Sequence, residues 1–408
     1  MFNVKSIEEV KEILVENFKD SYNKFELIDS VDSLNRILYE DIKSVENVPQ
    51  FNKSTVDGYA VKYKDILGAS DSMPILLNMI GKVEMGTDAK IIVNEGECVY
   101  VPTGGMLPNG TDAVVMIEKV EEIDKETIAF YTDITFNKNV ILKADDVKKG
   151  DVVLKKGIIL RPESIGVLVS LGIKKIKVFK KPKITIISTG DELVDIEENL
   201  KMGQIRDINT HTLKAISISY GLEVVETKVI KDIKEKITKS AKKAYSESDI
   251  VIVSGGSSMG EKDMTAEIID SLGDPGVLVH GMAIKPGKPT IVASCGGKPI
   301  IGLPGHPVSS IIVYKVLIET LLEKCFNFEI EKKRSLEATA LSNIHAAPGR
   351  TTYKMIKIEE INNEFVFAPS YGESGMITLL TTSNGYTIIP IDKEGIVKGE
   401  KVRVNYFY

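Results

Sequence analysis

Strands and helices alternate along residues 182–325, and this alternation limits the fold more than any other feature of the sequence. An apolar run at 184–187 is followed by a glycine-containing turn, a second run lies at 224–229, and a third lies at 250–253. Helical patterns near 210–220 and from Asp232 onwards separate these runs. Strands that are buried on both faces and joined by helices are typical of parallel sheets. We therefore predict a doubly wound α/β domain over residues 181–328.

The regions that flank residues 182–325 have a different sequence pattern. Short β-rich runs divided by Gly, Pro, Asn and Asp predict an inserted β-rich domain over residues 50–140. Residues 1–49 and 141–180 are predicted to form one split, mixed α/β domain on either side of it. A capping-box pattern at Ser6 and Glu9 begins a predicted helix over residues 6–19, and a second helix is expected over residues 31–40. Residues 329–408 favour a small β-barrel, with a sandwich as the alternative.

Composition excludes several classes of protein. Across 408 residues, 52 Lys and Arg oppose 58 Asp and Glu, which argues against broad nucleic-acid binding. The three cysteines and four histidines are scattered, so neither a disulfide framework nor a zinc site is indicated. The charged start has no signal-peptide pattern, and no apolar stretch reaches the roughly 18 residues of a membrane span. We expect a cytoplasmic protein with no membrane partner.

The loops after two predicted strands carry the first candidate site. Thr189, Gly190, Asp191 and Glu192 follow one strand, and residues 254–263 follow another, with Gly255, Gly256, Ser257 and Asp263 among them. Ligands of open α/β sheets bind at the carboxyl ends of the strands, and glycines let the backbone approach an anion. The alternative is ordinary turn chemistry with aspartate caps. Neither loop has the Walker or dinucleotide-binding spacing.

Further loops carry charge or glycine. Lys285 and Lys288 flank a Pro-Gly turn, and lysines bind oxyanions as point charges. Residues 302–310 include Pro304, Gly305 and Ser309 and precede an apolar helix whose start suits an anion. Upstream lie Asp57, the turn with Thr103 and Gly104, and the pair at 145–146. Each of these could instead be a plain surface turn.

Taken together and in chain order, six motifs resemble those of the molybdopterin molybdenumtransferase family, which includes MoeA and the E domain of gephyrin. Residues 54–61 are similar to S-x-M-D-G-Y-A-V, and residues 103–115 to T-G-A-x-x-P…D-A-V-V. The others lie at 189–193, 254–263, 285–289 and 303–309. The resemblance covers essentially the whole chain.

This resemblance implies a multidomain α/β plus β fold and an enzyme of molybdenum cofactor biosynthesis. Such an enzyme ligates molybdate to adenylylated molybdopterin, releases AMP and uses Mg²⁺. It further implies a homodimer, with the site between the α/β domain of one subunit and the first two domains of the other. On this basis Asp57, Asp146, Glu192 and Asp263 are expected to be catalytic, with Glu192 and Asp263 as metal ligands. The expected substrate-binding residues are Thr103, Gly104, Thr189, Gly190, Asp191, Gly255, Gly256, Ser257, Lys285, Lys288, Pro304, Gly305, Ser309, Arg350 and Ser374.

Two departures from the family pattern touch this expected site. His306 replaces the usual asparagine, and Ile141 stands where the family pattern has a basic residue. They leave open a preference for tungstate over molybdate. An adenylyltransferase acting on molybdopterin and a dimeric scaffold of the gephyrin type are the other readings.

Overall fold

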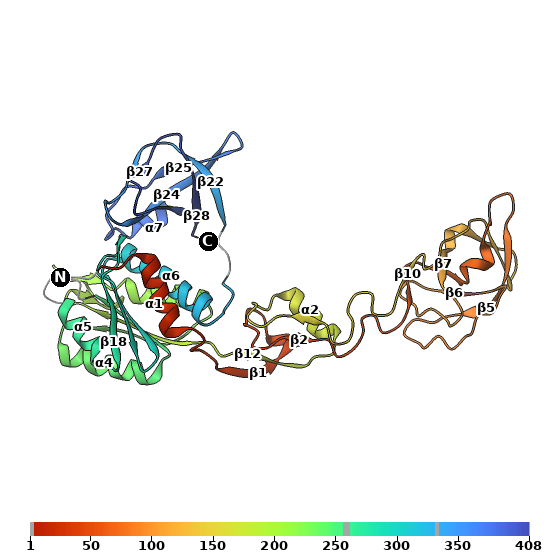
Figure 1. Ribbon diagram of the computed structural model, residues 1–408, viewed down its shortest axis with the longest axis horizontal. Coiled ribbons are helices and arrows are strands. Elements are labelled where there is room, and N and C mark those ends of the chain that lie inside the picture. Colours follow the sequence, from red (N-terminus) through yellow and green to blue (C-terminus); the bar gives the residue numbers. More distant parts are fainter. Residues whose placement is uncertain (1–3, 256–261, 331–333, 408) are drawn as a thin grey trace. The chain divides into compact units, whose positions relative to one another are not determined.

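The computed structural model describes residues 4–255, 262–330 and 334–407 of the chain. These residues form two compact units (Figure 1). The first comprises residues 1–39, 157–161 and 175–408, and the second comprises residues 40–156 and 162–174. Each unit is described separately. The domain boundaries expected from the sequence stay a prediction.

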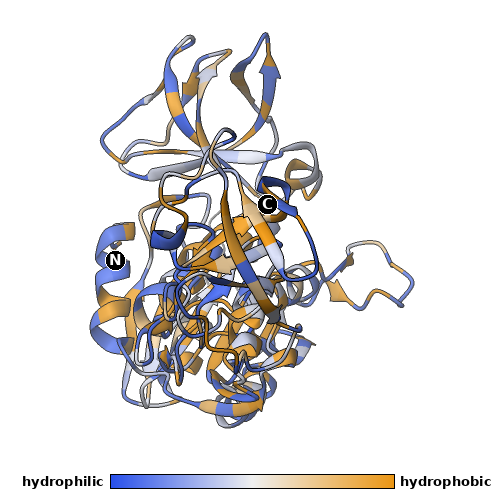
Figure 2. Cartoon of the chain, turned by 90° about the vertical axis from the view of Figure 1, so that its right-hand side faces the viewer, coloured by the Kyte–Doolittle hydropathy of each residue, from blue (hydrophilic) through white to orange (hydrophobic). Residues whose placement is uncertain are grey.

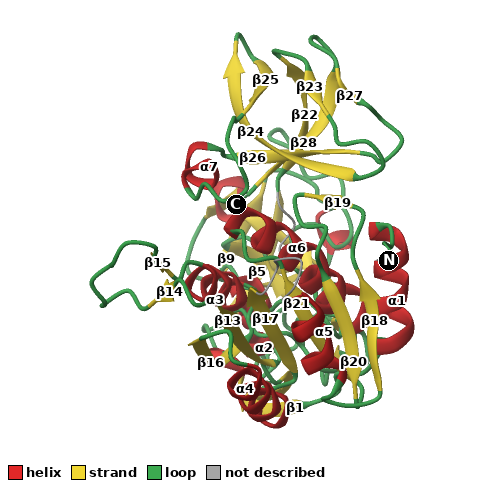
Figure 3. Ribbon diagram, turned by 90° about the vertical axis from the view of Figure 1, so that its left-hand side faces the viewer, coloured by secondary structure: helices red, strands yellow, loops and turns green. Residues whose placement is uncertain are grey.

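A six-stranded sheet forms the centre of the first unit, in the order β16-β13-β17-β21-β20-β18 (Figure 3). Its parallel part contains β16 (Glu223–Ile230), β13 (Lys183–Thr189), β17 (Ile250–Gly255) and β21 (Lys298–Leu303). Two antiparallel strands, β20 (Ile291–Cys295) and β18 (Pro275–His280), extend it. The predicted doubly wound, largely parallel α/β domain is confirmed.

Side chains of successive strand residues point to opposite faces of this sheet and fill two separate cores. Ile184 and Ile252 belong to the core that also contains residues of α1 (Ile7–Phe18), α3 (Asn209–Ser219) and α6 (Pro307–Thr320). Ile187 and Val253 belong to the other core, beneath α4 (Lys234–Glu247) and α5 (Lys262–Asp270). Burial on both faces explains why these strands read as continuous apolar runs.

The first helix begins as predicted. Ser6 Oγ accepts a hydrogen bond from Glu9 N, and the Glu9 carboxylate accepts one from Ser6 N, which together make a capping box. Figure 2 shows hydrophobic and hydrophilic residues alternating along this helix, and its buried residues all belong to the first core. A five-residue π-helical turn, Leu321–Cys325, follows α6.

The helix expected over residues 31–40 is wrong. The chain instead forms strand β1 (Phe25–Asp29), which pairs with β12 (Lys175–Phe179), and then a single 3₁₀ turn, Ser30–Asp32. Asn35 has φ of 60°, in the left-handed region, which stops any helix there. Ile37 and Leu38 then make isolated bridges to segments more than a hundred residues away. Long-range pairing has therefore overridden the local helical pattern.

A closed β-barrel forms the carboxyl-terminal part of the first unit. β24 (Thr351–Ile361) pairs with both β25 (Glu364–Pro369) and β26 (Gly385–Ile389). The ring is completed through β22 (Ser335–Ala340) and β28 (Lys401–Tyr406). Short elements join it: β19 (Ile284–Lys285), β23 (Ile344–His345), β27 (Gly395–Ile396) and α7 (Thr378–Thr382). The predicted barrel is confirmed.

The second unit is built mainly from strands, as the texture of its sequence predicts. Its six-stranded sheet has the order β7-β4-β6-β5-β9-β8. The strands are β4 (Gly58–Val61), β5 (Ile75–Lys82), β6 (Glu97–Val101), β7 (Ala113–Met116), β8 (Val120–Glu122) and β9 (Thr127–Phe130). Two small pairs and one helix accompany it: β2 (Ile42–Lys43) with β11 (Val152–Leu154), β3 (Lys53–Ser54) with β10 (Val140–Ile141), and α2 (Pro162–Ser170).

Within the described part of the chain, every helix is too short or too polar to cross a bilayer.

Candidate functional site

Three parallel strands of the first unit end side by side, and this edge holds the first group of predicted residues. Thr189 of β13 lies opposite Gly255 of β17, and Ser254 lies opposite Leu303 of β21. Thr189, Gly255 and the loop that begins at Pro304 therefore meet at the carboxyl edge of the sheet. This is the place where open α/β sheets bind ligands.

Several buried oxygens at this edge have no hydrogen-bond partner among the described residues. They are Ser188 Oγ, Thr189 Oγ1, Asn209 Oδ1 and Ser310 Oγ. Burying a polar group without a partner costs free energy, so native proteins rarely leave such atoms unsatisfied without a ligand, an ion or a water. Four of them around one edge indicate a polar ligand site.

Asn209 links the end of β17 to the loop after β21 by hydrogen bonds, a role that the sequence alone did not predict. Its Nδ2 donates to Ser254 Oγ at 2.9 Å and to the Gly305 carbonyl at 2.8 Å. The residue is 8% exposed. Asp207, also buried, accepts hydrogen bonds from Thr210 N and Thr210 Oγ1 at the start of α3. The available signal was the polar pair Asp207 and Asn209 at the start of the predicted helix.

The turn after β13 is fixed by lysine and backbone contacts. Lys231 Nζ donates to the carbonyls of Asp191 at 2.5 Å and Leu193 at 3.0 Å, and Asp232 N donates to Asp191 Oδ1 at 3.2 Å. Asp191 therefore holds the turn in place. Glu192 is exposed and folds back over Gly190, where a β-carbon would lie 2.8 Å from Glu192 Oε2. A side chain at 190 would therefore displace the exposed Glu192 carboxylate from this position.

Gly255 shows the same close approach. Its φ is 122°, and a β-carbon there would lie 2.1 Å from the Thr189 carbonyl and 2.8 Å from Thr189 Oγ1. A side chain at this position would cover one of the unsatisfied hydroxyls. Backbone conformation and space both require glycine.

The start of α6 gathers a second group of predicted residues. Pro307 occupies the first turn, where its missing N–H costs the helix no hydrogen bond. His306 Nδ1 and Ser374 Oγ share a hydrogen bond of 2.9 Å, and Val308 N donates to the Ser374 carbonyl at 3.2 Å. A β-carbon on Gly287 would lie 2.4 Å from Val313 Cγ2, so the turn between Lys285 and Lys288 packs against the same helix.

Positively charged side chains lie near the start of α6. β19 pairs with β24 so that Lys285 lies opposite Thr352, two residues from Arg350. Lys354, which the sequence analysis missed, is half-buried and lies 5.5 Å from the Tyr371 ring centroid. Burial and, secondarily, the charge of Lys285 lower the pKa of Lys354. Clustered cations beside a helix N-terminus favour a tetrahedral oxyanion.

The second unit contains the remaining predicted residues. Asp57 is exposed, and its Oδ1 accepts a hydrogen bond of 2.8 Å from Thr103 N, so these two motifs meet. Gly104 follows with φ of 80°, and its N donates to the Ser54 carbonyl. Asp146 lies exposed in another turn, where its N donates to the Val48 carbonyl at 3.1 Å.

Some predicted positions cannot be placed. Gly256 and Ser257 lie outside the described residues, and Asp263 is described only as a backbone position in α5. In the described ranges, no group of three or more acidic, histidine or cysteine side chains could hold a metal ion. The expected metal ligation by Glu192 and Asp263 stays a prediction.

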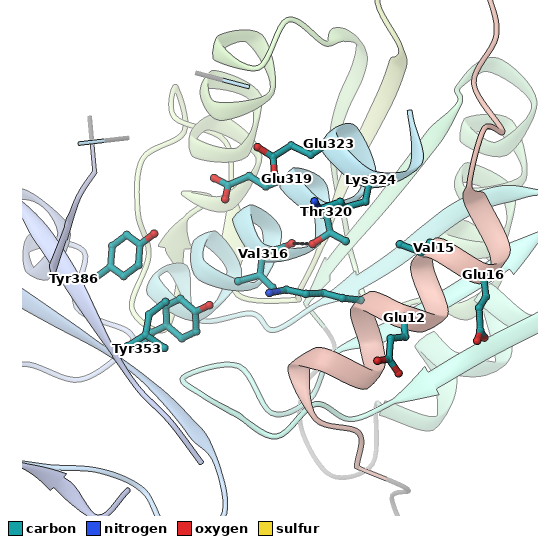
Figure 4. Close-up of a pocket in the computed structure, with 12 residues that line it drawn as sticks. Glu12, Val15, Glu16, Val316, Glu319, Thr320, Glu323, Lys324, Tyr353 and Tyr386 are labelled. Atoms are coloured by element: carbon teal, nitrogen blue, oxygen red, sulfur yellow. Dashed lines mark hydrogen bonds between the residues drawn. The ribbon is translucent and has the colours of Figure 1, made fainter. Parts of the chain in front are cut away.

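A separate cavity of about 560 Å³ lies near the other end of α6 (Figure 4). Glutamates of α1 and of residues 319–323 line it together with stacked Tyr353 and Tyr386, whose ring centroids are 5.7 Å apart. Burial and the charge of Glu319 raise the pKa of Tyr386 to about 12, so this phenol stays neutral at ordinary pH. None of the predicted site residues lines this cavity.

The fold defines a multidomain protein with a doubly wound α/β domain, a β-rich second unit and a carboxyl-terminal β-barrel. Family profiles agree. The MoeA N-terminal region (domain I and II) matches residues 5–172, the probable molybdopterin binding domain matches residues 185–324, and the MoeA C-terminal region (domain IV) matches residues 337–407.

Individual relatives extend over nearly the whole chain. A Methanocaldococcus jannaschii protein, whose name places it provisionally in molybdopterin biosynthesis, is 38% identical over 98% of this chain and 97% of its own. The molybdopterin molybdenumtransferase of Haemophilus influenzae is 34% identical over 94% of each chain. The crystal structure of a molybdopterin biosynthesis MoeA protein from Pyrococcus horikoshii is similar, with a TM-score of 0.85, 35% identity and complete coverage of both chains. The chain belongs to the molybdopterin molybdenumtransferase (MoeA) family, which places it in molybdenum cofactor biosynthesis.

Proposed function

We propose that this chain ligates molybdate to the dithiolene of adenylylated molybdopterin and releases AMP. In this reaction water adds across the phosphoanhydride bond of the adenylylated pterin, which gives AMP and the pterin phosphate. The two dithiolene sulfurs bind molybdenum and displace one oxygen of molybdate, which leaves as water. Family membership supports the transferase class. The observation that carries the proposal for this chain is the carboxyl edge of β13, β17 and β21, where buried oxygens have no partner in the part of the chain that the structure describes.

The two groups of the first unit suit the two halves of such a reaction. Thr189 Oγ1 can donate to a phosphate, and Asn209 Oδ1 can accept from an N–H of a pterin or adenine ring. Lys285, Lys288, Arg350 and Ser374 would receive the oxyanion at the start of α6. Ser309 lies in the first turn of that helix, where its N–H and hydroxyl are available. Lys354 adds a further positive charge beside Lys285.

A divalent cation fits the chemistry of the carboxyl edge. The atoms there are carboxylate, hydroxyl and amide oxygens, which are the ligands that Mg²⁺ prefers. Glu192 and Asp263 would hold it. Such a cation neutralises charge on the phosphates as the anhydride breaks. Support for this role comes from the exposure of Glu192 and from its carboxylate lying against Gly190, one residue after Thr189.

The residues of the second unit enter the proposal through a homodimer. Asp57 and Asp146 are exposed carboxylates, and Thr103 and Gly104 lie beside Asp57. We place them against the carboxyl edge of a second copy, where they would position the cation and the adenylyl group. In a dimer these exposed carboxylates would contact the substrate, whereas in a simple surface turn they would have no function.

The preferred oxyanion is molybdate, with tungstate as the alternative. His306 bonds to Ser374 at the start of α6, so the substitution of histidine for the usual asparagine contacts a residue that would position the oxyanion. Molybdate and tungstate have the same shape and charge. Discrimination between them would therefore depend on how the side chains position the oxyanion, and not on a difference in charge.

The test is AMP release by purified protein given adenylylated molybdopterin, Mg²⁺ and either oxyanion. We expect Asp57→Ala, Asp146→Ala and Glu192→Gln each to lower the rate at least about a hundredfold. Asp145→Ala is the matched control because it removes an exposed carboxylate from the turn of Asp146. Wild-type turnover in all three variants, with folding unchanged, would refute these roles.

A further inference from the structure

A second cavity, of about 910 Å³, lies in the first unit at the opposite edge of the parallel sheet. Pro182, just before β13, and Gly221, just before β16, line it. These positions are at the amino ends of the strands, whereas the candidate site lies at the carboxyl ends. Its volume is within the usual range for small-molecule sites. None of the predicted site residues lines it.

The lining of this cavity is strongly positive. Among the described residues that line it, six are cationic and one, Glu329, is a carboxylate. The cations are Arg36, Arg161, Lys180, Lys181, Lys315 and Arg334. Glu329 Oε2 already accepts a hydrogen bond of 3.0 Å from Ile159 N. The chain as a whole carries a formal charge of −6, so this excess of positive charge is local. A concave surface lined by one sign of charge attracts ligands of the opposite sign.

The cavity also has aromatic walls. Phe179, Phe328 and Phe407 line it and are each less than 10% exposed, with the first two ring centroids 4.8 Å apart. Lys315 is 8% exposed, and its Nζ lies 5.6 Å from the Phe407 ring centroid. Ile216, Ile218 and Ile330 add further apolar surface. Apolar surface beside buried and exposed cations suits a ligand with a flat ring at one end and negative charge at the other.

We propose that this cavity binds an aromatic organic phosphate of the nucleotide class. The exposed Lys180 and Lys181 would hold the phosphates through charge-assisted hydrogen bonds, whereas Arg36 already pairs with the Glu26 carboxylate. The phenylalanine and isoleucine side chains would cover the base. The site is distinct from the carboxyl edge, and the proposal does not depend on the transferase reaction.

The first experiment localises binding with a single fluorophore, because the chain contains no tryptophan. Ile218, which lines the cavity and is 57% exposed, becomes the reporter in Ile218→Trp. Ile361→Trp, at the end of β24, is the matched control, since Ile361 is 47% exposed and lies neither in the cavity lining nor among the residues of the carboxyl edge. ADP should change the fluorescence of the first protein at saturable concentrations and leave the second unchanged. Equal responses, or none in either protein, would refute the site.

The second experiment tests the chemistry of recognition in the Ile218→Trp background. ADP should bind at least about tenfold more tightly than inorganic pyrophosphate, which lacks the ring, or adenosine, which lacks the charge. Lys180→Gln with Lys181→Gln should weaken ADP at least about tenfold. Lys236→Gln with Lys239→Gln removes the same charge from exposed positions on α4 and should change the affinity less than about twofold. Equal losses in both double variants, or equal affinity for ADP and pyrophosphate, would overturn the proposal.

Discussion

Replacing Asn209 by leucine tests whether this buried amide holds the carboxyl edge together. The substitution removes both donor bonds, to Ser254 Oγ and to the Gly305 carbonyl. Each bond contributes about 1 kcal/mol, and a carbonyl left without a donor costs a further ~1–2 kcal/mol. The larger apolar side chain offsets about 1 kcal/mol through burial, and removal of the buried Oδ1 that has no described partner offsets about 1 kcal/mol more. The expected net loss is therefore about 1–2 kcal/mol.

Hydrogen exchange with mass spectrometry is the appropriate assay, because two compact units make a single global unfolding transition unsafe to assume. The opening free energy of peptides covering α3 and the loop after β21 should fall by that amount. Asn17→Leu is the control: Asn17 is exposed on α1, and its Nδ2 donates one bond to the Ile13 carbonyl. Water replaces that bond, so the control should change by less than about 0.5 kcal/mol. A change equally small in Asn209→Leu would refute the reasoning.

Two further predictions concern packing and charge. In Gly58→Ala the new β-carbon would lie 1.9 Å from the Val115 carbonyl oxygen, so the free energy of unfolding of the second unit, measured by calorimetry, should fall by at least about 2 kcal/mol. Gly166→Ala is the control, because a β-carbon there meets open space on α2, and it should be neutral or stabilising. Because the pKa of Lys354 is lowered, that lysine loses its charge at a lower pH than an ordinary lysine. Molybdate affinity, measured by calorimetric titration, should therefore fall as pH rises through the alkaline range, and Lys354→Arg should move this fall to higher pH; an identical pH profile in the two proteins would exclude Lys354 from the oxyanion site.

Local sequence signals predicted the elements that depend on local chemistry. The capping box at Ser6 and Glu9 begins α1, Pro307 begins α6, and the apolar run at 184–187 forms the buried core of β13. The expected helix over residues 31–40 failed because Leu38 is buried through a bridge to Val178, a partner that no local pattern reveals.

The residues of the candidate site also divide into those that the local sequence predicts and those that it does not. Glycine-rich loops after strands predicted Thr189 and Gly255, because glycine is the residue type that both a tight turn and a close approach of the backbone favour. Asn209 and Lys354 were missed, since their importance comes from burial and from neighbours distant in the sequence. An asparagine at a helix start and a lysine in a strand look ordinary until the surrounding fold is known.

A crystal structure of the protein with adenylylated molybdopterin would test the central claim most directly. The account predicts the ligand at the carboxyl edge of the parallel sheet, within hydrogen-bond distance of Thr189 Oγ1 and Asn209 Oδ1. A fully occupied ligand bound elsewhere, with both oxygens still without partners, would contradict it.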